Sequence, residues 1–458
     1  MRSRRTFCAA ARLTDMDELS LKKEILEKVA AYAKLRSGNR GDFKPGESRI
    51  DYAGRVFDEA EFLNLTEAAL EFWLTAGRWT KEFEEKLAAK LGLRRALFVN
   101  SGSSANLLAF MTLTSPLLGG RRIGRGDEVI TVAAGFPTTV APIVQYGAIP
   151  VFVDVEPGTA NINADRLEAA LSKRTKAVML AHTLGNPFRL DAVKAFCDAH
   201  GLWLVEDNCD ALGSTYRGKW TGSWGDIGTS SFYPPHHMTT GEGGAVYTDD
   251  PLLAKIALSM RDWGRECSCA PGEDGRCGHR FSHQFGTLPE GYDHKYVYSH
   301  FGYNLKATDL QAAIGCAQLE KLDGFTAARK RNFLRLYDGL RDMPELALFE
   351  KYPDSDPSWF GFLITLTGKA GVTRNDMARH LEGKRIQTRN LFAGNLTRHP
   401  CFESLREGVD FRISGGLEAT DNLMNNAFWI GLYPGMTDEK LDYMIECIRF
   451  CCNDNRGV

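Results

Sequence analysis

The stretch Leu202-Trp203-Leu204-Val205-Glu206-Asp207-Asn208-Cys209-Asp210 joins four apolar residues to a run of mostly polar ones. Continuous apolar residues are typical of a strand that is buried on both faces of a parallel sheet. Ligands of such sheets bind beyond the carboxyl ends of the strands, so Asp207 is a candidate ligand-binding residue. The alternative interpretation is a carboxylate that only caps a local turn.

Six similar short runs surround this one. They lie at residues 96–99, 128–131, 151–153, 177–180, 229–232 and 245–247. Helical patterns separate several of them, for example at 167–171 and 192–200. Apolar strands joined by helices predict an α/β protein whose mainly parallel sheet of about seven strands is flanked by helices.

The remaining segments divide the chain into three parts. We expect an N-terminal helical segment at 1–75, a large domain at 76–325 and a smaller C-terminal α+β domain at 326–458. Residues 265–295 are rich in Gly, Cys and charge and predict an irregular insertion. Within these parts, the patterns predict helices at 17–35, 309–340, 374–381 and 438–452, and a strand at 360–365.

Composition excludes several classes of function. The 458 residues include 56 Lys plus Arg and 58 Asp plus Glu, a net charge of -2 that gives no general attraction to nucleic acid. No apolar run is long enough to span a bilayer, and the apolar stretch after the basic N-terminus is too short for a secretory signal. We therefore expect a cytoplasmic protein without nucleic-acid or membrane partners. Its 11 cysteines argue against a disulfide scaffold.

The segment Asn100-Ser101-Gly102-Ser103-Ser104-Ala105 follows a predicted strand and opens a predicted helix. The amide groups and small hydroxyls of such a turn can hold a phosphate at the helix N-terminus. A serine-rich helix cap is the alternative interpretation.

Several motifs in this order resemble the nucleotide-sugar aminotransferases of the fold-type I pyridoxal-phosphate (PLP) class. The resemblance covers about residues 70–450. The motifs are Gly77-Arg78-Trp79, the serine-rich turn, Gly126-Asp127-Glu128-Val129-Ile130, Glu206-Asp207, Ser231-Phe232-Tyr233-Pro234, Glu242-Gly243-Gly244 and Gly302-Tyr303-Asn304.

The resemblance implies a fold-type I PLP-dependent transferase fold and a set of cofactor contacts. Ser103, Ser104 and Ser231 would hold the cofactor phosphate. Phe136 would stack on its ring, and Asp207 would meet the pyridine nitrogen. Asn304 would reach the phosphate of a second subunit, which implies a homodimer with shared active sites.

The chain departs from the aminotransferases at the position of their Schiff-base lysine. That position, five residues after Ser231, is His236, and no lysine lies between Lys219 and Lys255. A histidine cannot form the Schiff base, so we expect a non-covalent cofactor, pyridoxamine phosphate (PMP) or PLP. His236 can still act as a general base at the cofactor C4′ atom. The neighbouring His237 is the weaker candidate, and either histidine could be purely structural.

Four cysteines form the second departure. Cys209, Cys267, Cys269 and Cys277 have the spacing C-x57-C-x1-C-x7-C. Four thiolates could ligate zinc or an iron-sulfur cluster, and a spacing of one residue is unusual for zinc.

Within the family, the cysteine spacing and His236 resemble the PMP- and 2Fe-2S-dependent 3-dehydratases of 3,6-dideoxyhexose biosynthesis. This implies removal of the C3 hydroxyl from a nucleotide-linked 4-keto-6-deoxyhexose, with a CDP-linked sugar expected and a TDP-linked 2,6-dideoxy sugar as the nearest alternative. An NAD(P)H-dependent iron-sulfur flavoprotein would be the reductase. The other hypotheses are a GDP-sugar 3-dehydratase without a cluster and a zinc-stapled, non-enzymatic PLP-fold binding protein.

Overall fold

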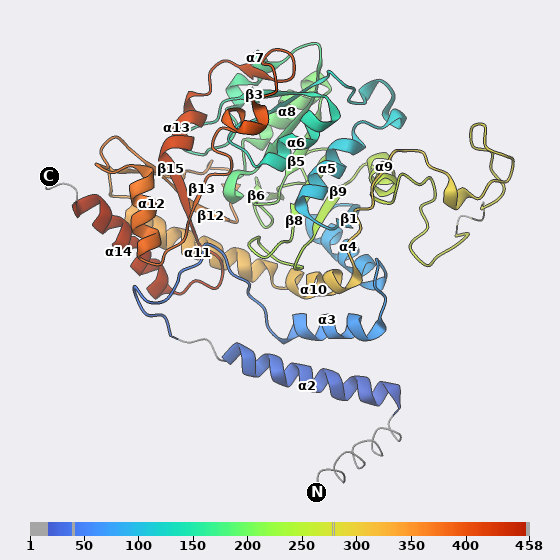
Figure 1. Cartoon of the computed structure of the whole chain (residues 1–458), viewed down its shortest axis with the longest axis horizontal. Coiled ribbons are helices and arrows are strands. Elements are labelled where there is room, and N and C mark those ends of the chain that lie inside the picture. The colour runs from blue at the N-terminus through green and yellow to red at the C-terminus, as the bar shows by residue number, and fades with distance from the viewer. Residues whose placement is uncertain (1–16, 39–41, 277, 279, 455–458) are drawn as a thin grey trace, which may run out of the picture.

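The computed structural model describes residues 17–38, 42–276, 278 and 280–454, and its centre is an eight-stranded sheet (Figure 1). In spatial order the strands are β1 (Arg95–Val99), β9 (Gly244–Thr248), β8 (Ile227–Ser231), β5 (Trp203–Asp207), β4 (Thr175–Ala181), β2 (Glu128–Thr131), β3 (Ile149–Val153) and β14 (Arg412–Ser414). β9 alone runs in the direction opposite to the other seven strands. The prediction of an α/β protein with a mainly parallel sheet is therefore confirmed.

All seven predicted strands of this sheet are present, and β14 is the strand that the sequence did not indicate. It pairs in parallel with β3 at the sheet edge. Two of its three residues, Arg412 and Ile413, are only half-buried, so the chain carries no apolar run there. The large sheet thus takes one strand from the C-terminal part, and the domain division at residues 75 and 325 stays a proposal.

The central strand β5 separates two hydrophobic clusters. Val205 packs in one cluster with residues of α5 (Gly102–Thr112) and α9 (Pro251–Arg261). Leu204 packs in the other with residues of α8 (Leu190–His200) and of the C-terminal part. Successive side chains of a strand point to opposite faces of the sheet. Asp207 therefore lies on the same face as Val205, and Glu206 lies on the same face as Leu204. The two carboxylates therefore lie on opposite faces of the sheet.

In the described part of the N-terminal segment, the predicted helix at 17–35 is present. Helix α2 (Glu18–Gly38) lies along α3 (Glu59–Glu71), which packs on α10 (Asp309–Leu319) (Figure 1). Helix α4 (Arg78–Leu91) also packs on α10. The predicted helix at 309–340 is two helices, because a break at residues 320 and 321 separates α10 from α11 (Leu322–Leu340).

The C-terminal part contains a four-stranded antiparallel sheet and helices. Its strands, in spatial order, are β10 (Leu346–Leu348), β12 (Gly361–Leu366), β15 (Ala427–Gly431) and β13 (Thr388–Asn390), and its other helices are α12 (Arg374–Gly383), α13 (Glu418–Asn426) and α14 (Asp438–Asp454). The predicted strand at 360–365 and both predicted helices are confirmed within a residue or two at each end. A small third sheet joins β6 (Thr215–Tyr216), β7 (Lys219–Trp220) and β11 (Ser355–Asp356).

The cysteine-containing insertion forms an arm that projects away from the sheet (Figure 1). Among its described residues, a single short 3-10 turn at His294–Tyr296 is the one regular element. No helix in the described part of the chain is long and apolar enough to cross a bilayer.

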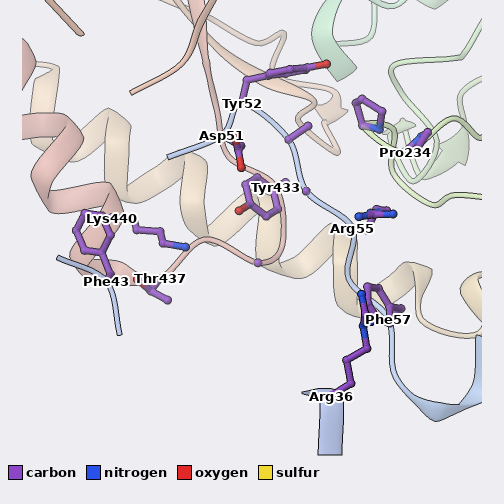
Figure 2. A pocket seen from close by; sticks show the side chains of 14 residues that line it. Arg36, Phe43, Asp51, Tyr52, Arg55, Phe57, Pro234, Tyr433, Thr437 and Lys440 are labelled. Atoms are coloured by element: carbon purple, nitrogen blue, oxygen red, sulfur yellow. The ribbon is translucent and has the colours of Figure 1, made fainter. Parts of the chain in front are cut away.

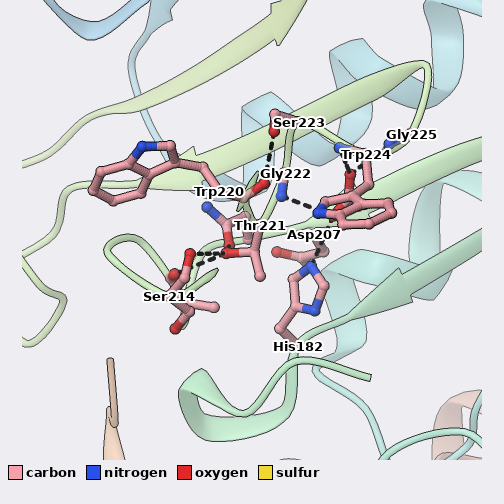
Figure 3. Close-up of polar contacts among 12 residues, drawn as sticks. His182, Asp207, Ser214, Trp220, Thr221, Gly222, Ser223, Trp224 and Gly225 are labelled. Atoms are coloured by element: carbon pink, nitrogen blue, oxygen red, sulfur yellow. Dashed lines mark hydrogen bonds and ion pairs between the residues drawn. The ribbon is translucent and has the colours of Figure 1, made fainter. Parts of the chain in front are cut away.

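Glu206 anchors the carboxyl end of β5. Its fully buried carboxylate accepts hydrogen bonds from the backbone N–H groups of Gly222, Trp224 and Gly225, at 2.7, 2.7 and 2.6 Å (Figure 3). His182 Nε2 lies 3.0 Å from the same carboxylate. This network ties β5 to the loop before β8, so the loop and the strand end keep one arrangement.

We expect Glu206→Gln to lower the free energy of unfolding by about 2 to 4 kcal/mol, because at least one buried backbone N–H loses its acceptor. Chemical denaturation measures this change. Glu242→Gln, at an exposed glutamate, is the matched control and should leave the transition within about 0.5 kcal/mol. Equal midpoints for the two variants would contradict the anchoring role.

Candidate active site

The serine-rich turn caps α5 and lies against the end of β8. Ser101 is the N-cap, and its Oγ accepts a hydrogen bond from the Ser104 backbone N–H. A Cβ atom on Gly102 would come within 2.3 Å of Ser231 Cβ and 3.1 Å of Cys209 Sγ. The chain therefore needs glycine there, and the turn, Ser231 and Cys209 share one location.

The hydroxyls predicted to hold a phosphate differ in exposure. Ser103 is exposed and makes no hydrogen bond within the described residues, and Ser104 is half-buried. Ser231 is buried at the end of β8. Ser101 therefore caps the helix, as in the alternative interpretation, while a phosphate contact of the Ser103 hydroxyl and of the first two amides of the helix stays a prediction.

Asp207 is buried and held from two helices. Its Oδ2 accepts hydrogen bonds from Asn106 Nδ2 and Thr139 Oγ1, both at 2.7 Å. Asn106 is fixed in turn, because its Oδ1 accepts from Thr229 Oγ1 at 2.7 Å. Oδ1 of Asp207 accepts the Cys209 backbone N–H at 3.2 Å, and the Cys209 thiol also hydrogen-bonds this carboxylate. The carboxylate is thus oriented and retains acceptor capacity for a cationic ring nitrogen.

Sequence analysis missed Asn106 and Thr139. Each lies within the first five residues of a helix that follows a strand, α5 for Asn106 and α6 (Pro137–Tyr146) for Thr139. A search for polar side chains in the first turns of such helices would have found both.

His236 lies in the loop after β8, with both ring nitrogens in contact with protein oxygens. Nδ1 is 3.2 Å from the Ser231 carbonyl oxygen, which can only accept, so this nitrogen carries a proton. Nε2 is 3.1 Å from Asp210 Oδ1. The ring also meets the edges of Tyr233 and Phe360, with centroids at 4.5 and 5.1 Å. His236 is therefore fixed in place, with Nε2 at hydrogen-bond distance from a carboxyl group.

Asp210 was not assigned a role from the sequence. It is buried, and burial raises the pKa of its carboxyl group. Its second oxygen, Oδ2, has no hydrogen-bond partner within the described residues. A carboxyl group with a raised pKa beside an imidazole is suited to pass a proton in either direction.

His237 has a different environment. It is buried, and its Nε2 donates to the Ser358 carbonyl oxygen at 2.6 Å. Burial, reinforced by the positive charge of Arg329, holds the pKa of His237 well below its usual value. A neutral imidazole bound to a carbonyl serves the packing of the loop, which agrees with its rank as the weaker candidate base.

Arg329 of α11 holds the His236 loop from behind. This fully buried guanidinium donates to the carbonyls of Trp359 and Phe360, and to those of Pro235 and His236, over 3.1 to 3.5 Å. Burial lowers the pKa of Arg329 to about 9, so the group is still protonated at neutral pH. Sequence analysis did not indicate this role, because the contacts join residues that are far apart in the chain.

Phe136 and Asn304 lie on the surface of this single chain. Phe136 is 49% exposed and meets the edge of Phe392, with centroids 6.3 Å apart. Asn304 is exposed, and its Oδ1 accepts from Lys306 Nζ at 2.8 Å. The next residue, Leu305, accepts from the Asn100 backbone N–H at 2.8 Å, beside the start of the serine-rich turn. The predicted ring stacking by Phe136 and the predicted contact of Asn304 with a partner both stay predictions.

The four cysteines do not meet within the described residues. Cys267 and Cys269 line one small cavity in the arm, together with Lys295 and Arg280. Cys209 lies instead beside Asp207, where burial and the negative charge of Asp207 raise the pKa of its thiol well above the usual value. Cys277 lies outside the described residues. In the described part of the chain, no group of three His, Cys, Asp or Glu side chains could hold a metal ion, and because Cys277 lies outside that part, the four-thiolate site stays a prediction.

Comparisons with known proteins agree with this geometry. The profile of the DegT/DnrJ/EryC1/StrS aminotransferase family matches residues 56–449. The chain is 53% identical to the dTDP-4-dehydro-2,6-dideoxy-D-glucose 3-dehydratase of Saccharopolyspora spinosa, over 93% of this chain and 91% of the relative. It is also 53% identical to the lipopolysaccharide biosynthesis protein RfbH of Salmonella typhimurium, over 93% of this chain and 97% of the relative.

Solved structures give the same fold. The GDP-4-keto-6-deoxy-D-mannose-3-dehydratase of E. coli with bound hydrated PLP superimposes with a TM-score of 0.79 at 28% identity, over 87% of this chain and 99% of that one. A mutant of the GDP-4-keto-6-deoxymannose-3-dehydratase with bound GDP-perosamine gives a TM-score of 0.78 at 28% identity, over 87% and 100%. The fold class implied by the sequence motifs is therefore confirmed.

We expect Arg329→Met to lower the free energy of unfolding by about 2 kcal/mol, because four carbonyls lose their donor. Modification of His236 by diethyl pyrocarbonate, followed by peptide mass spectrometry, should also accelerate as the loop loosens. Arg335→Met, on the same helix and paired with Asp442 at the surface, is the matched control. An unchanged modification rate in Arg329→Met would mean that the loop does not depend on this guanidinium.

Proposed function

Because the chain belongs to the DegT/DnrJ/EryC1/StrS aminotransferase family, we propose that it is a nucleotide-sugar 3-dehydratase that binds its cofactor without a covalent bond. The observation that carries this proposal is His236, which stands where the aminotransferases have their lysine and is fixed between the Ser231 carbonyl and Asp210. No lysine between residues 219 and 255 can replace it. The two relatives at 53% identity and the 3-dehydratase structures support the same conclusion.

The residues present fit PMP or PLP. The serine-rich turn offers first-turn amides and the Ser103 hydroxyl to the phosphate, and Gly102 lets Ser231 approach closely. The oriented carboxylate of Asp207 suits a protonated pyridine nitrogen. When bound, PMP supplies an amine that condenses with the 4-ketone of the sugar and a ring that accepts electrons.

The chain's own residues then move protons. With PMP bound, His236 would serve as the base for the C4′ proton, and the electrons released there would allow the C3 hydroxyl of the sugar to leave as water once it is protonated. Asp210 orients the imidazole and exchanges a proton with Nε2. Arg329 keeps the loop in place, and the edges of Tyr233 and Phe360 restrict water around the ring.

For the substrate we propose CDP-4-dehydro-6-deoxy-D-glucose, as the sequence motifs imply. A TDP-linked 4-keto-2,6-dideoxy sugar is the second candidate, favoured by the 53% identity to the dTDP-sugar 3-dehydratase. The GDP-sugar 3-dehydratase of E. coli is more distant, at 28% identity. Both favoured nucleotides are pyrimidine nucleoside diphosphates.

A 2Fe-2S cluster on Cys209, Cys267, Cys269 and Cys277 stays a proposal that rests on their spacing. The shared cavity of Cys267 and Cys269 supports it. The described residues do not bring Cys209 to that cavity, so we assign no electron-transfer step within one chain. An NAD(P)H-dependent iron-sulfur flavoprotein as reductase, and a homodimer completed by Asn304, are proposals of the same kind.

His236→Asn should bind PMP normally and lose the substrate-dependent exchange of the C4′ hydrogen with solvent, by about 10² to 10⁴ in rate. Deuterium incorporation at C4′ measures this exchange. His237→Asn, which alters the buried neighbour, should retain exchange in whatever fraction folds. Normal exchange in His236→Asn would exclude this histidine as the base.

His236→Lys tests the position itself. We expect this variant to attach PLP covalently, because the phosphate and pyridine contacts are unchanged. Borohydride reduction and peptide mass spectrometry should then find a pyridoxyl group at residue 236, whereas the wild-type protein should carry none on any lysine of the site. A pyridoxyl-lysine in the wild-type site would overturn the non-covalent assignment.

Anaerobic reconstitution with iron and sulfide tests the cysteines. Cys267→Ser and Cys269→Ser should each lose most of the iron and the visible absorption, since a thiolate ligand is removed. Cys401→Ser, at an exposed cysteine, is the control. If Cys209→Ser binds as much iron as the wild-type protein, Cys209 is not a ligand of the cluster. If the protein binds zinc in place of iron, the alternative of a zinc-containing, non-enzymatic binding protein is favoured.

A further inference from the structure

One aromatic residue of the C-terminal part has a backbone conformation that a bulky side chain disfavours. Phe392 has a φ angle of 43°, in the left-handed region that favours glycine. It follows β13 and occupies the second position of a tight turn, in which the Gly394 backbone N–H donates to the Leu391 carbonyl oxygen at 2.7 Å. Such strain persists only where the surrounding structure over-determines the conformation, and it is often found at functional sites.

Hydrogen bonds from outside the turn hold it in this conformation. The Ala393 carbonyl oxygen accepts from His399 Nε2 at 2.7 Å. The Ala393 backbone N–H donates to the Gly135 carbonyl oxygen at 3.4 Å. The Leu396 backbone N–H donates to the Ala133 carbonyl oxygen at 3.0 Å. The last two bonds join this turn of the C-terminal part to the loop between β2 and α6, so the two segments are fixed relative to each other.

The loop that accepts these bonds carries Phe136 to the candidate active site. It follows the carboxyl end of β2, and Phe136 is the N-cap residue of α6. Three residues later, Thr139 donates to Asp207 Oδ2 at 2.7 Å. The backbone of Phe136 thus lies one helical turn from a residue that contacts the carboxylate proposed for the pyridine nitrogen. Its ring is 49% exposed, which leaves room for a planar ligand.

The ring of Phe392 contacts the ring of Phe136. Their centroids are 6.3 Å apart and their planes are close to perpendicular, at 77°. A perpendicular neighbour covers at most one face of Phe136, so the other face can stack on a ligand. Phe392 is half-buried and packs against the hydrophobic cluster that contains Leu391 and Phe428. Its ring therefore has a fixed backbone below it and the core behind it, and it can hold Phe136 in one orientation.

We propose that Phe392 is a positioning residue for the cofactor, because its turn fixes the ring of Phe136 and that ring stacks on the cofactor ring. The inference rests on the proposed function, since it needs PMP or PLP at Asp207. Phe392 acts through Phe136 rather than on the reacting atoms. A cofactor that is bound without a covalent bond depends on stacking and hydrogen bonds alone, so the orientation of Phe136 contributes directly to its retention. This gives a physical reason for phenylalanine at a position where glycine fits the backbone better.

Phe392→Gly removes the ring and relieves the backbone, so it separates cofactor positioning from stability. We expect PMP binding to the cofactor-free protein to weaken about three- to tenfold by calorimetry, because Phe136 loses its aromatic neighbour. The circular dichroism of the bound cofactor should decrease as well. The free energy of unfolding should change little, because relief of the positive φ angle offsets the lost packing. Phe392→Tyr keeps the ring contact and should bind PMP like the wild-type protein.

A double-mutant cycle tests whether the effect passes through Phe136. Phe136→Leu should weaken PMP binding on its own, and Phe136→Leu/Phe392→Gly should weaken it no further. Additive losses would overturn the inference, because Phe392 would then affect the cofactor by another route. Arg385→Gly relieves another positive φ angle, of 67°, at an exposed residue of the C-terminal part, and it is the matched control. An equal loss of PMP binding in this control would also overturn the inference.

Hydrogen exchange provides a readout that needs no cofactor and separates this inference from the proposed function. In the cofactor-free protein, the amides of Ala393 and Leu396 should exchange faster in Phe392→Gly than in wild type, and at the wild-type rate in Phe392→Tyr. If wild type binds PMP and Phe392→Gly binds it equally tightly, the inference fails and the proposed function stands. If wild type binds neither PMP nor PLP, the proposed function fails, and an unchanged exchange rate in Phe392→Gly would then also exclude the positioning of Phe136 by Phe392.

Discussion

Two adjacent carboxylates at the end of β5 determine how the rest of the molecule is arranged. Glu206 and Asp207 are both buried, and strand alternation sends them to opposite faces of the sheet. Burying a carboxylate is costly unless hydrogen bonds compensate it, so each face must supply donors. Glu206 receives three backbone amides, and Asp207 receives Asn106 and Thr139. The covering elements are therefore fixed relative to one strand end, and the candidate site is built on that end.

A second constraint replaces the covalent bond that the aminotransferases make. Under the proposed function no lysine at position 236 would tether the cofactor, so the loop itself must be rigid if His236 is to meet a particular atom. Arg329 supplies this rigidity by donating to carbonyls of the His236 loop and of the segment at Trp359 and Phe360. The His236 loop is thus held by α11 and by the residues that directly precede β12. These contacts connect the loop after β8 to the C-terminal part of the chain.

The sequence predicted what depends on short-range pattern. The strands of the large sheet carry apolar runs, and Asp207, Ser231 and the serine-rich turn follow such runs, so their common location could be inferred. Strand β14 has no such run, and it was missed. The roles of Asp210 and Arg329 depend on contacts between residues that are distant in the sequence. Asp210 and His236 are 26 residues apart, and Arg329 is 93 residues from His236, whose carbonyl it contacts. The cysteine spacing indicated one site, and this stays a prediction, since the described residues place Cys267 and Cys269 in one cavity without Cys209, and Cys277 lies outside them.

A cavity of about 650 Å³, lined by residues 51–55, Tyr433 and Lys440, and the candidate active site depend on the same short segment (Figure 2). Pro234 and Pro235 form one wall of the cavity, and the next residue is His236. Proline fixes the backbone φ angle, so a ligand that presses on this wall acts on a stiff connection rather than on a flexible loop. Binding energy from a part of the substrate that does not react can serve to orient the part that does, provided that the connection is rigid. A smaller cavity that reaches His236 is lined by Arg55 as well as by Pro234 and Arg329, so residues of the N-terminal segment and of α11 lie beside a site built on β5 and β8.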